Sequence, residues 1–464
     1  MAQVECPSDG LTAPTGWSEA PEGWILCICL GGALSLMGLW KRAPAHGRAL
    51  AFILGQAILL TAPLFAHLDR FIIGRFPTTD KYGSLAFYLD GVHRRLLLDP
   101  AGSLTDPAAR LIGVHMGHLW VTEFFDLFMT PEGAMNLQGF LYPVLAWASA
   151  ALLFRALGAK PGVSILMAFP YGMGLHLFRD LNCYTVEKAA VFWLPLFVMS
   201  LYKSHTEGAR WPLVTGLLYL VMSWMNLYMG AVGAALAALL TLPLWGLGAT
   251  ALFRMRISTL PSALRALCYC VLFSLPLLAW QHSLSSGPTA LGSPDAFRLR
   301  AELDSVSLWP PTWNRMSWWA AMSPVGLGIA AAGGWTSRRD PLIRTAAIAI
   351  AGLTALSLGP WVGALINPAD WLARELIPGF WRAAEPESFF HGSWLLILAV
   401  GAVALSRHAL PRWGAGALYL VMVSGWIFTV RGHAEFPSMS HKVDIQLADG
   451  WAERAFQTPA EGSD

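Results

Sequence analysis

The chain has 464 residues, of which 55% are hydrophobic and only 13% are charged, and its mean hydropathy is +0.50. A soluble domain carries about 25% charged residues, because water must wet its surface. This composition excludes a water-soluble globular protein, and a net charge of +2 gives no reason to expect a nucleic-acid partner.

Long apolar runs recur from one end of the chain to the other. Because lipid cannot hydrogen-bond the backbone, runs of this length predict helices, and closed barrels would show short alternating strands instead. A break of about two residues around Asn226 predicts a tight outer hairpin between two of them. The predicted fold class is an all-α, polytopic transmembrane helix bundle that forms a single domain over residues 1–464. We expect about twelve spans, near 24–40, 49–67, 137–157, 161–178, 188–203, 211–226, 228–249, 264–281, 319–336, 343–359, 389–406 and 414–430.

The loops between these spans form two alternating sets that differ in charge. The short set holds only two acids, Glu207 and Asp340, and is rich in basic residues. The basic residues in it are Lys41, Arg42, Arg48, Arg155, Lys160, Lys203, Arg210, Arg254, Arg256, Arg265, Arg338, Arg339, Arg344, Arg407 and Arg412. The positive-inside rule places these loops in the cytoplasm and both termini outside.

The opposite, non-cytoplasmic face receives four long segments: 68–136, 282–318, 360–388 and the tail 431–464. A transporter usually has short loops on both sides and a site at mid-membrane. Long segments on one aqueous face instead favour chemistry at the membrane surface.

The first of these segments contains the main candidate catalytic residue, Asp80. Thr78 or Thr79 can cap a helix that begins near Asp80, which places this carboxylate at a helix N-terminus beside the membrane surface. There it could accept a proton from an attacking hydroxyl or bind a divalent cation that neutralises a phosphate leaving group. An ordinary acid, favoured by the helix dipole, is the alternative.

Further along, the apolar stretch from Leu111 to Met129 carries His115, His118, Glu123 and Asp126. His115 and His118 are three residues apart, so they share a helical face as a metal-binding pair would. The alternative is an interfacial or re-entrant helix whose polar residues face an aqueous cleft.

Cationic side chains gather around the end of the fourth predicted span. His176, Arg179 and Lys188 could line a site for an anionic lipid head group. Alternatively, they pair or extend towards water, as ionisable groups at span ends commonly do.

Six cysteines do not form a metal-binding pattern. Four of them lie in predicted spans as two Cys-x-Cys pairs, which we interpret as small apolar fillers. Cys6 and Cys183 could both face an oxidising compartment, where a disulfide between them is conceivable.

Several short motifs occur in order along the chain. They are FMTPEG at 128–133, PYGMGLH at 170–176 followed by Asn182 and WLPL at 193–196, WMNLYMG at 224–230, SLGP at 357–360 and PGFWR at 378–382. Together they resemble the GT-C glycosyltransferase-like superfamily of bacterial polytopic membrane proteins.

This resemblance implies an enzyme that moves a sugar from a polyprenyl-phosphate donor to an acceptor at the outer face of the bacterial inner membrane. An acid in the first outer loop is then the key catalytic group, and Asp80 best matches it. By the same resemblance Arg179 and Arg382 would hold the lipid phosphate, and His115 and His118 would be lesser candidates.

Two other functions stay open. Where many relatives carry a second arginine after the PGF motif, this chain has Glu385, which favours a non-catalytic membrane protein that binds a glycolipid or a protein partner. A transporter or flippase would require charges deep within spans and internal repeats, which the sequence does not display.

Overall fold

The computed structural model of the protein describes residues 21–39, 45–66, 71–73, 116–174, 177–178, 181, 189–241, 260–285, 324–359, 361–362, 365–376, 388–407, 412–427 and 439–441.

Helices dominate these residues, as the all-α prediction requires. They are α1 (Pro21–Leu39), α2 (Ala45–Leu60), α3 (Ala62–Ala66), α7 (Met116–Asp126), α8 (Pro131–Ala156), α9 (Pro161–Gly172), α11 (Trp193–Thr206), α12 (Trp211–Met225), α13 (Leu227–Thr241), α15 (Leu260–Ser285), α18 (Pro324–Thr336), α19 (Pro341–Ser357), α20 (Pro368–Leu376), α21 (Phe389–Arg407) and α22 (Arg412–Trp426). Every range predicted as a span overlaps one of these helices, and α7 lies in the apolar stretch where a further helix was an alternative.

Length and composition single out three of the described helices as able to cross a membrane. These candidate spans are Glu22–Leu39, Gly133–Ala156 and Phe389–Arg407. The shorter apolar helices are Gly47–Leu60, Trp211–Met225, Tyr228–Thr241, Leu264–Leu277, Pro341–Ser357 and Gly414–Trp426. The chain therefore has the helices of a membrane protein, and the total of twelve crossings stays a prediction.

The surface of the helix bundle is apolar. Large hydrophobic side chains are exposed along several helices, and Leu26 and Leu36 of α1 are 65% and 70% exposed. Others are Leu145 and Leu152 of α8, Leu213 and Leu217 of α12, Val271, Leu272 and Leu275 of α15, Ile348 of α19, and Leu420 and Val421 of α22. Soluble monomers rarely expose apolar surface on this scale, so lipid is the solvent that this surface suits.

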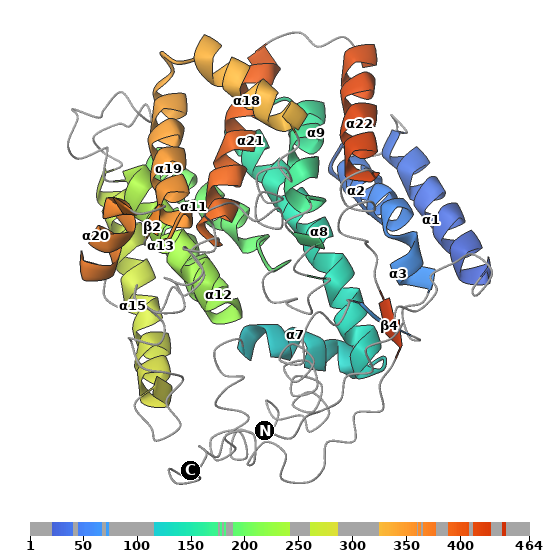
Figure 1. Ribbon diagram of the computed structural model, residues 1–464, viewed down its shortest axis with the longest axis horizontal. Helices are drawn as coiled ribbons and strands as arrows, with labels where there is room; N and C mark the ends of the chain where they lie inside the picture. Colours follow the sequence, from blue (N-terminus) through green and yellow to red (C-terminus); the bar gives the residue numbers. More distant parts are fainter. Residues whose placement is uncertain are drawn as a thin grey trace.

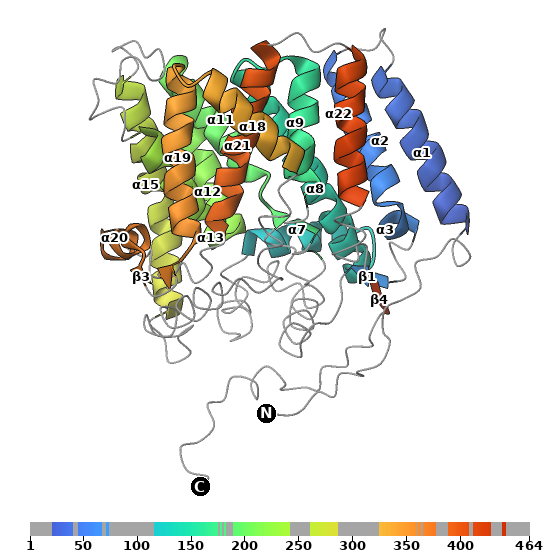
Figure 2. The ribbon, with the colours of Figure 1, turned by 45° about the horizontal axis from the view of Figure 1, so that its top comes forward.

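Most of the helices run side by side, whereas α7 lies across one end of the bundle (Figures 1 and 2). The long helix α21 is central, and nearly all of its side chains are buried. It packs against α8, α9, α18 and α19. At the periphery, α1 packs mainly against α2.

The centre of the bundle is the crossing of α8 and α9. A Cβ atom added at Gly172 would lie 2.4 Å from the backbone nitrogen of Trp147, so only glycine allows this approach. The Trp147 indole donates to the carbonyl of Ile165 at 2.8 Å, and the Trp394 indole donates to that of Pro170 at 3.3 Å. Since the last four carbonyls of a helix lack intrahelical partners, the Trp394 bond also completes the end of α9.

Side-chain hydrogen bonds join the peripheral helices α1, α2 and α22. The Tyr419 hydroxyl donates to Gln56 Oε1 at 2.6 Å, and Gln56 Nε2 donates to Ser35 Oγ at 2.9 Å. Polar bonds of this kind hold apolar helices together where burial from water gives no driving force between them.

Two short strand pairs accompany the helices. Strand β1 (Phe71–Ile73) pairs antiparallel with β4 (Met439–His441), with Ile72 opposite Ser440. Strand β2 (Trp361–Val362) pairs antiparallel with β3 (Leu365–Ile366). The first pair joins the segment after α3 to the C-terminal tail, a contact that the apolar pattern of the sequence does not reveal.

The α8–α9 crossing yields a test of the fold. We expect Gly172→Ala to destabilise the protein by about 1–3 kcal/mol, because the new methyl group must displace the backbone of α8. Thermal unfolding in detergent micelles measures the change. Gly162→Ala on the same helix is the matched control, since no atom lies within 4 Å of a Cβ there. Equal melting temperatures for the two variants would contradict this close crossing.

Candidate functional site

The two ends of the bundle differ in polarity. The backbone of Lys160 donates to Ser406 Oγ at 2.9 Å, and Arg407 forms an ion pair with Asp340. These contacts bring the α8–α9 turn, the α18–α19 turn and the end of α21 together at one end of the bundle. The basic residues of these segments therefore lie at the same end. At the other end, α7 lies across the bundle (Figure 2), and the buried polar side chains there include several acids and amides. They include Glu123, Asn136, Gln138, Asn226, Asn367 and Asp370.

Helix α7 is held across this second end by contacts with α12. A Cβ atom at Gly117 would lie 2.8 Å from the sulfur of Met225, so glycine permits close contact. The rings of Trp120 and Trp224 meet edge to face with their centroids 5.6 Å apart. The helix is thereby fixed at the α12–α13 junction.

The two faces of α7 have opposite character. Trp120 and Phe124 on its outer side are 48% and 57% exposed, and Phe128 just after the helix is 72% exposed, whereas His118 and Glu123 are buried. The polar side of the helix therefore faces the protein, and its aromatic side faces away. This arrangement is the reverse of a helix on a soluble protein.

A compact hydrogen-bond network links the buried side of α7 to α8. The Thr122 hydroxyl donates to Gln138 Oε1 at 2.6 Å. The Gln138 amide nitrogen lies 2.8 Å from His118 Nδ1 and 2.6 Å from the Tyr142 hydroxyl. Tyr142 and His118 are also within 2.9 Å of each other. Four buried polar side chains are thus satisfied by one another, as burial requires.

Buried His118 takes part in this network through its ring nitrogen Nδ1. The role of Nδ1 depends on the tautomer of the ring: it accepts from the Gln138 amide when the proton is on Nε2, and it donates to the Tyr142 hydroxyl when the proton is on Nδ1. The other member of the predicted metal pair, His115, lies outside the described residues, so the pair stays a prediction. Within the described residues, no three His, Cys, Asp or Glu side chains come together to hold a metal ion.

The motif at 128–133 forms the corner between α7 and α8. Thr130 is the N-cap of α8, and its hydroxyl oxygen accepts from the backbone N–H of Gly133 at 3.2 Å. Pro131 occupies the first helical position, where its missing N–H costs nothing. The corner thereby sets the angle between the transverse helix and the central one.

Asn226 forms the predicted tight junction between α12 and α13. Its side-chain oxygen accepts from the backbone N–H groups of Tyr228 at 2.8 Å and Met229 at 3.3 Å. The single residue between the two helices is thus also the cap of the second, and the predicted hairpin is confirmed.

Asn367 plays a similar part between α19 and α20. Its amide nitrogen donates to the carbonyls of Ala355 and Gly359 at 2.6 and 2.7 Å, and its oxygen accepts from Ala369 N–H at 3.1 Å. The side chain closes the end of α19 and begins α20. This short amphipathic helix within 360–388 was not predicted, because its apolar positions are too few to stand out.

Most of the predicted site residues lie outside the described residues. They are Asp80, His115, His176, Arg179, Lys188 and Arg382, together with Cys6 and Cys183. Leu177 and Phe178, which lie between His176 and Arg179 in the sequence, are buried. Ala189, which follows Lys188, is buried as well. Phe178 packs edge to face on Trp426 of α22, with centroids 5.7 Å apart.

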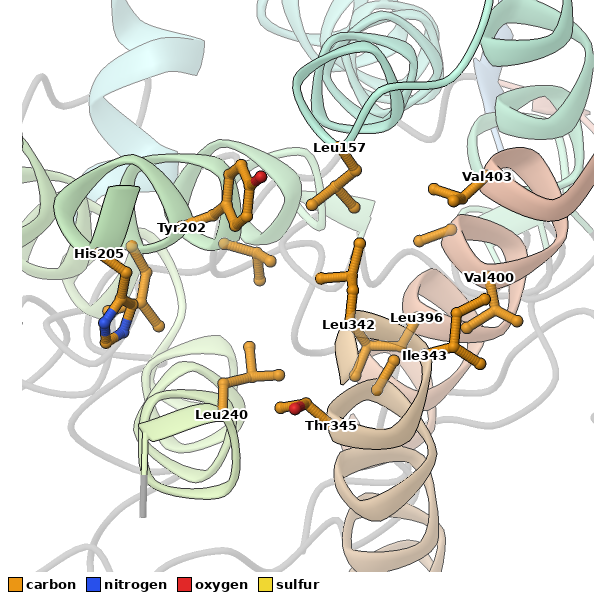
Figure 3. Close-up of a pocket in the computed structure, with 14 residues that line it drawn as sticks. Leu157, Tyr202, His205, Leu240, Leu342, Ile343, Thr345, Leu396, Val400 and Val403 are labelled. Carbon is orange, nitrogen blue, oxygen red and sulfur yellow. The ribbon is translucent and has the colours of Figure 1, made fainter. Parts of the chain in front are cut away.

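A pocket of different character opens at the basic end of the bundle (Figure 3). Fourteen residues of α11, α13, α19, α21 and the turn after α8 line it, and most of them are aliphatic. The polar exceptions are Tyr202, His205 and Thr345. The pocket lies at the opposite end of the bundle from the α7 network, so it is not part of the same site.

No family model and no curated protein matches the chain. The function must therefore be argued from the residues and their arrangement.

The α7–α8 network can be tested through stability. We expect Gln138→Leu to cost about 2 kcal/mol, because the Thr122 hydroxyl and the Tyr142 oxygen each lose a buried partner. Thermal unfolding in detergent micelles measures the loss. Leu145→Ala, at an exposed position of the same helix, removes no hydrogen bond and serves as the control. If the control loses as much as Gln138→Leu, the network does not stabilise the corner.

Proposed function

We propose that the chain is a polytopic membrane glycosyltransferase of the GT-C class, with about twelve spans in the bacterial inner membrane. It transfers a sugar from a polyprenyl-phosphate donor to an acceptor at the outer face. The ordered motifs that resemble this superfamily support the proposal, as does the array of apolar helices.

The observation that carries the proposal is the polar end of the bundle beneath α7. There, Glu123 of the transverse helix α7 and Gln138 of the neighbouring helix α8 are buried, while Trp120 and Phe124 of α7 are exposed. Such a helix suits the boundary between lipid head groups and acyl chains, with its aromatic side towards lipid. An enzyme that joins a lipid-linked donor to a water-soluble acceptor needs its site at this boundary.

The proposed reaction is a single displacement. The acceptor hydroxyl oxygen bonds to the anomeric carbon as the bond from that carbon to the phosphate oxygen breaks, so the configuration inverts. Asp80 takes the hydroxyl proton or holds a cation against the departing phosphate. Arg179 and Arg382, with His176 and Lys188 near the same face, compensate the charge that develops on that phosphate.

Glu385 favours the competing proposal of a non-catalytic binder. An acid in the loop that contains Arg382 would oppose a bound phosphate. Such a protein would bind a glycolipid or a protein partner without turnover, so a turnover assay distinguishes the two.

We expect Asp80→Asn to lower transfer of lipid-linked sugar by at least about a hundredfold, because an amide cannot accept the proton. Turnover of labelled polyprenyl-phosphate sugars by membranes that contain the protein measures this. Asp106→Asn, in the same outer segment, should retain activity. Turnover unaffected by Asp80→Asn would remove the catalytic role of Asp80, and an inactive parent protein would favour the binder.

The orientation can be tested by cysteine labelling in a variant that lacks its native cysteines. A maleimide that does not cross membranes should label Ser103→Cys in spheroplasts and should label Arg339→Cys only after permeabilisation. The basic α18–α19 turn would then be cytoplasmic, as the positive-inside rule requires. The reverse pattern would place Asp80 in the cytoplasm and remove the proposed outer site.

A further inference from the structure

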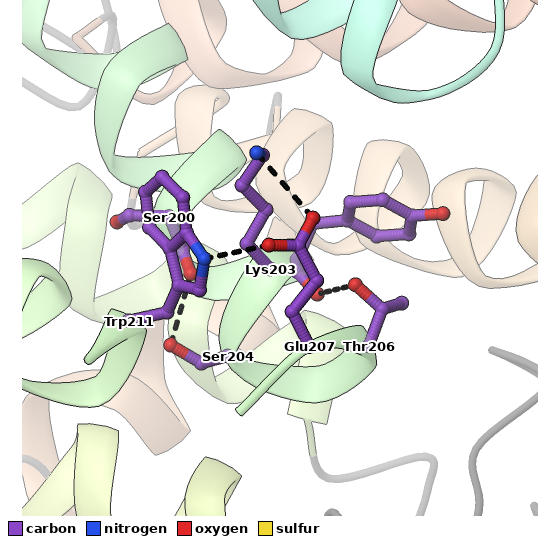
Figure 4. Close-up of polar contacts among 7 residues, drawn as sticks. Ser200, Lys203, Ser204, Thr206, Glu207 and Trp211 are labelled. Atoms are coloured by element: carbon purple, nitrogen blue, oxygen red, sulfur yellow. Dashed lines mark hydrogen bonds and ion pairs between the residues drawn. The ribbon is translucent and has the colours of Figure 1, made fainter. Parts of the chain in front are cut away.

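Two contacts between a tryptophan ring and a cation lie at the basic end of the bundle, and they differ in charge balance. In the first, Lys203 Nζ lies 4.3 Å from the ring centroid of Trp211. Glu207 lies 3.4 Å from the same Nζ and accepts from the Trp211 indole at 2.7 Å (Figure 4). Lys203 therefore has its counter-ion within the protein.

The second contact, in the turn between α18 and α19, has no such acid. The guanidinium carbon of Arg338 lies 4.6 Å from the ring centroid of Trp335. Arg344 Nε donates to the carbonyl of Arg338 at 3.0 Å, which brings a second arginine to this turn. The acid of the turn, Asp340, pairs with Arg407 instead. Among the described residues, no carboxylate forms an ion pair with Arg338 or Arg344.

Exposed apolar side chains lead along both helices to this turn. On α18, Leu327, Ala331 and Trp335 are exposed, and Trp335 is 72% exposed. On α19, Arg344 and Ile348 are exposed. Since residues four apart lie on one face of a helix, each helix has an outward apolar face that reaches the turn. A tryptophan at the end of a lipid-facing helix lies at the level of the lipid head groups.

From this juxtaposition we infer that the cluster of Trp335, Arg338 and Arg344 binds the head group of an anionic phospholipid. Guanidinium groups bind phosphate oxygens strongly, often through two parallel hydrogen bonds. The acyl chains of the lipid then run along the exposed apolar face of α18 that ends at Trp335. An acidic protein partner would match the charge but would leave this apolar face unexplained. The inference goes beyond the proposed transfer reaction and does not depend on it.

Native mass spectrometry of the purified full chain tests the inference. The probes are an anionic and a zwitterionic phospholipid with identical acyl chains. We expect the anionic lipid to bind at least about fivefold more tightly, which corresponds to the attraction of a single cation near the membrane surface. Equal binding of the two lipids would overturn the assignment and would favour an acidic protein as the partner of the cluster.

The position of the site is tested by the double variant Arg338→Gln and Arg344→Gln. This variant should lose the preference for the anionic lipid and keep its affinity for the zwitterionic lipid. The matched control, Lys203→Gln with Arg265→Gln, removes the same charge outside the cluster and should keep the preference, because Glu207 already compensates Lys203. A preference that survives the first variant, or that both variants lose equally, would overturn the assignment to this turn.

The part of the ring is tested by Trp335→Leu, which keeps an apolar side chain and removes the face against which Arg338 lies. We expect the preference for the anionic lipid to fall about two- to fivefold, as for the loss of an exposed contact of this kind. Trp371→Leu on α20, where the tryptophan is 51% exposed, is the control and should change nothing. An unchanged preference in Trp335→Leu would overturn the role of this ring in the site.

Discussion

The structure depends on one constraint, that a polar group surrounded by lipid must find its partner within the protein. Hydroxyl side chains in the helices obey it by donating to the carbonyl one turn earlier. The described examples include Ser35, Thr61, Ser164, Ser204, Thr215, Thr345 and Ser406. Gln56 and Gln138 cannot be satisfied in this way, so each also bonds to a second helix: Gln56 to Ser35 of α1, and Gln138 to Thr122 of α7. Amide side chains thereby become the fixed points of the bundle.

The same constraint separates the two ends of the bundle. Lys203 and Arg407 lie at helix ends, where water and the acids Glu207 and Asp340 compensate their charge. At the other end, His118 and Glu123 of α7 are buried, and the helix presents aromatic side chains on its outer side. One end of the bundle is therefore basic and accessible, and the other end buries amide and acidic side chains.

The helical architecture could be predicted from the sequence because each apolar run ends at charges or at Gly and Pro. The Asn226 junction was also visible, since a lone amide between two apolar runs has few other uses. In contrast, α20 and the β1–β4 pair depend on tertiary partners, such as the capping of α19 by Asn367, that no local pattern records. For the candidate site, the sequence indicated His118 but not Gln138. The spacing of two histidines suggests a metal, and only the three-dimensional structure reveals that His118 Nδ1 lies 2.8 Å from the amide nitrogen of Gln138.

Two carboxylates are buried at the end of the bundle where α7 lies. Glu123 and Asp370 are 5% and 1% exposed. Replacing a buried ionic group by an apolar one of similar size is often neutral or even stabilising, so such a group is weak evidence for a structural need. Each of the two carboxylates interacts with other groups of the protein. Glu123 belongs to α7 and Asp370 to α20, so the burial of carboxylates is a property of this end of the bundle and not of one helix. The constraint that closes hydroxyl and amide groups on the protein therefore extends to charged groups where the helices end.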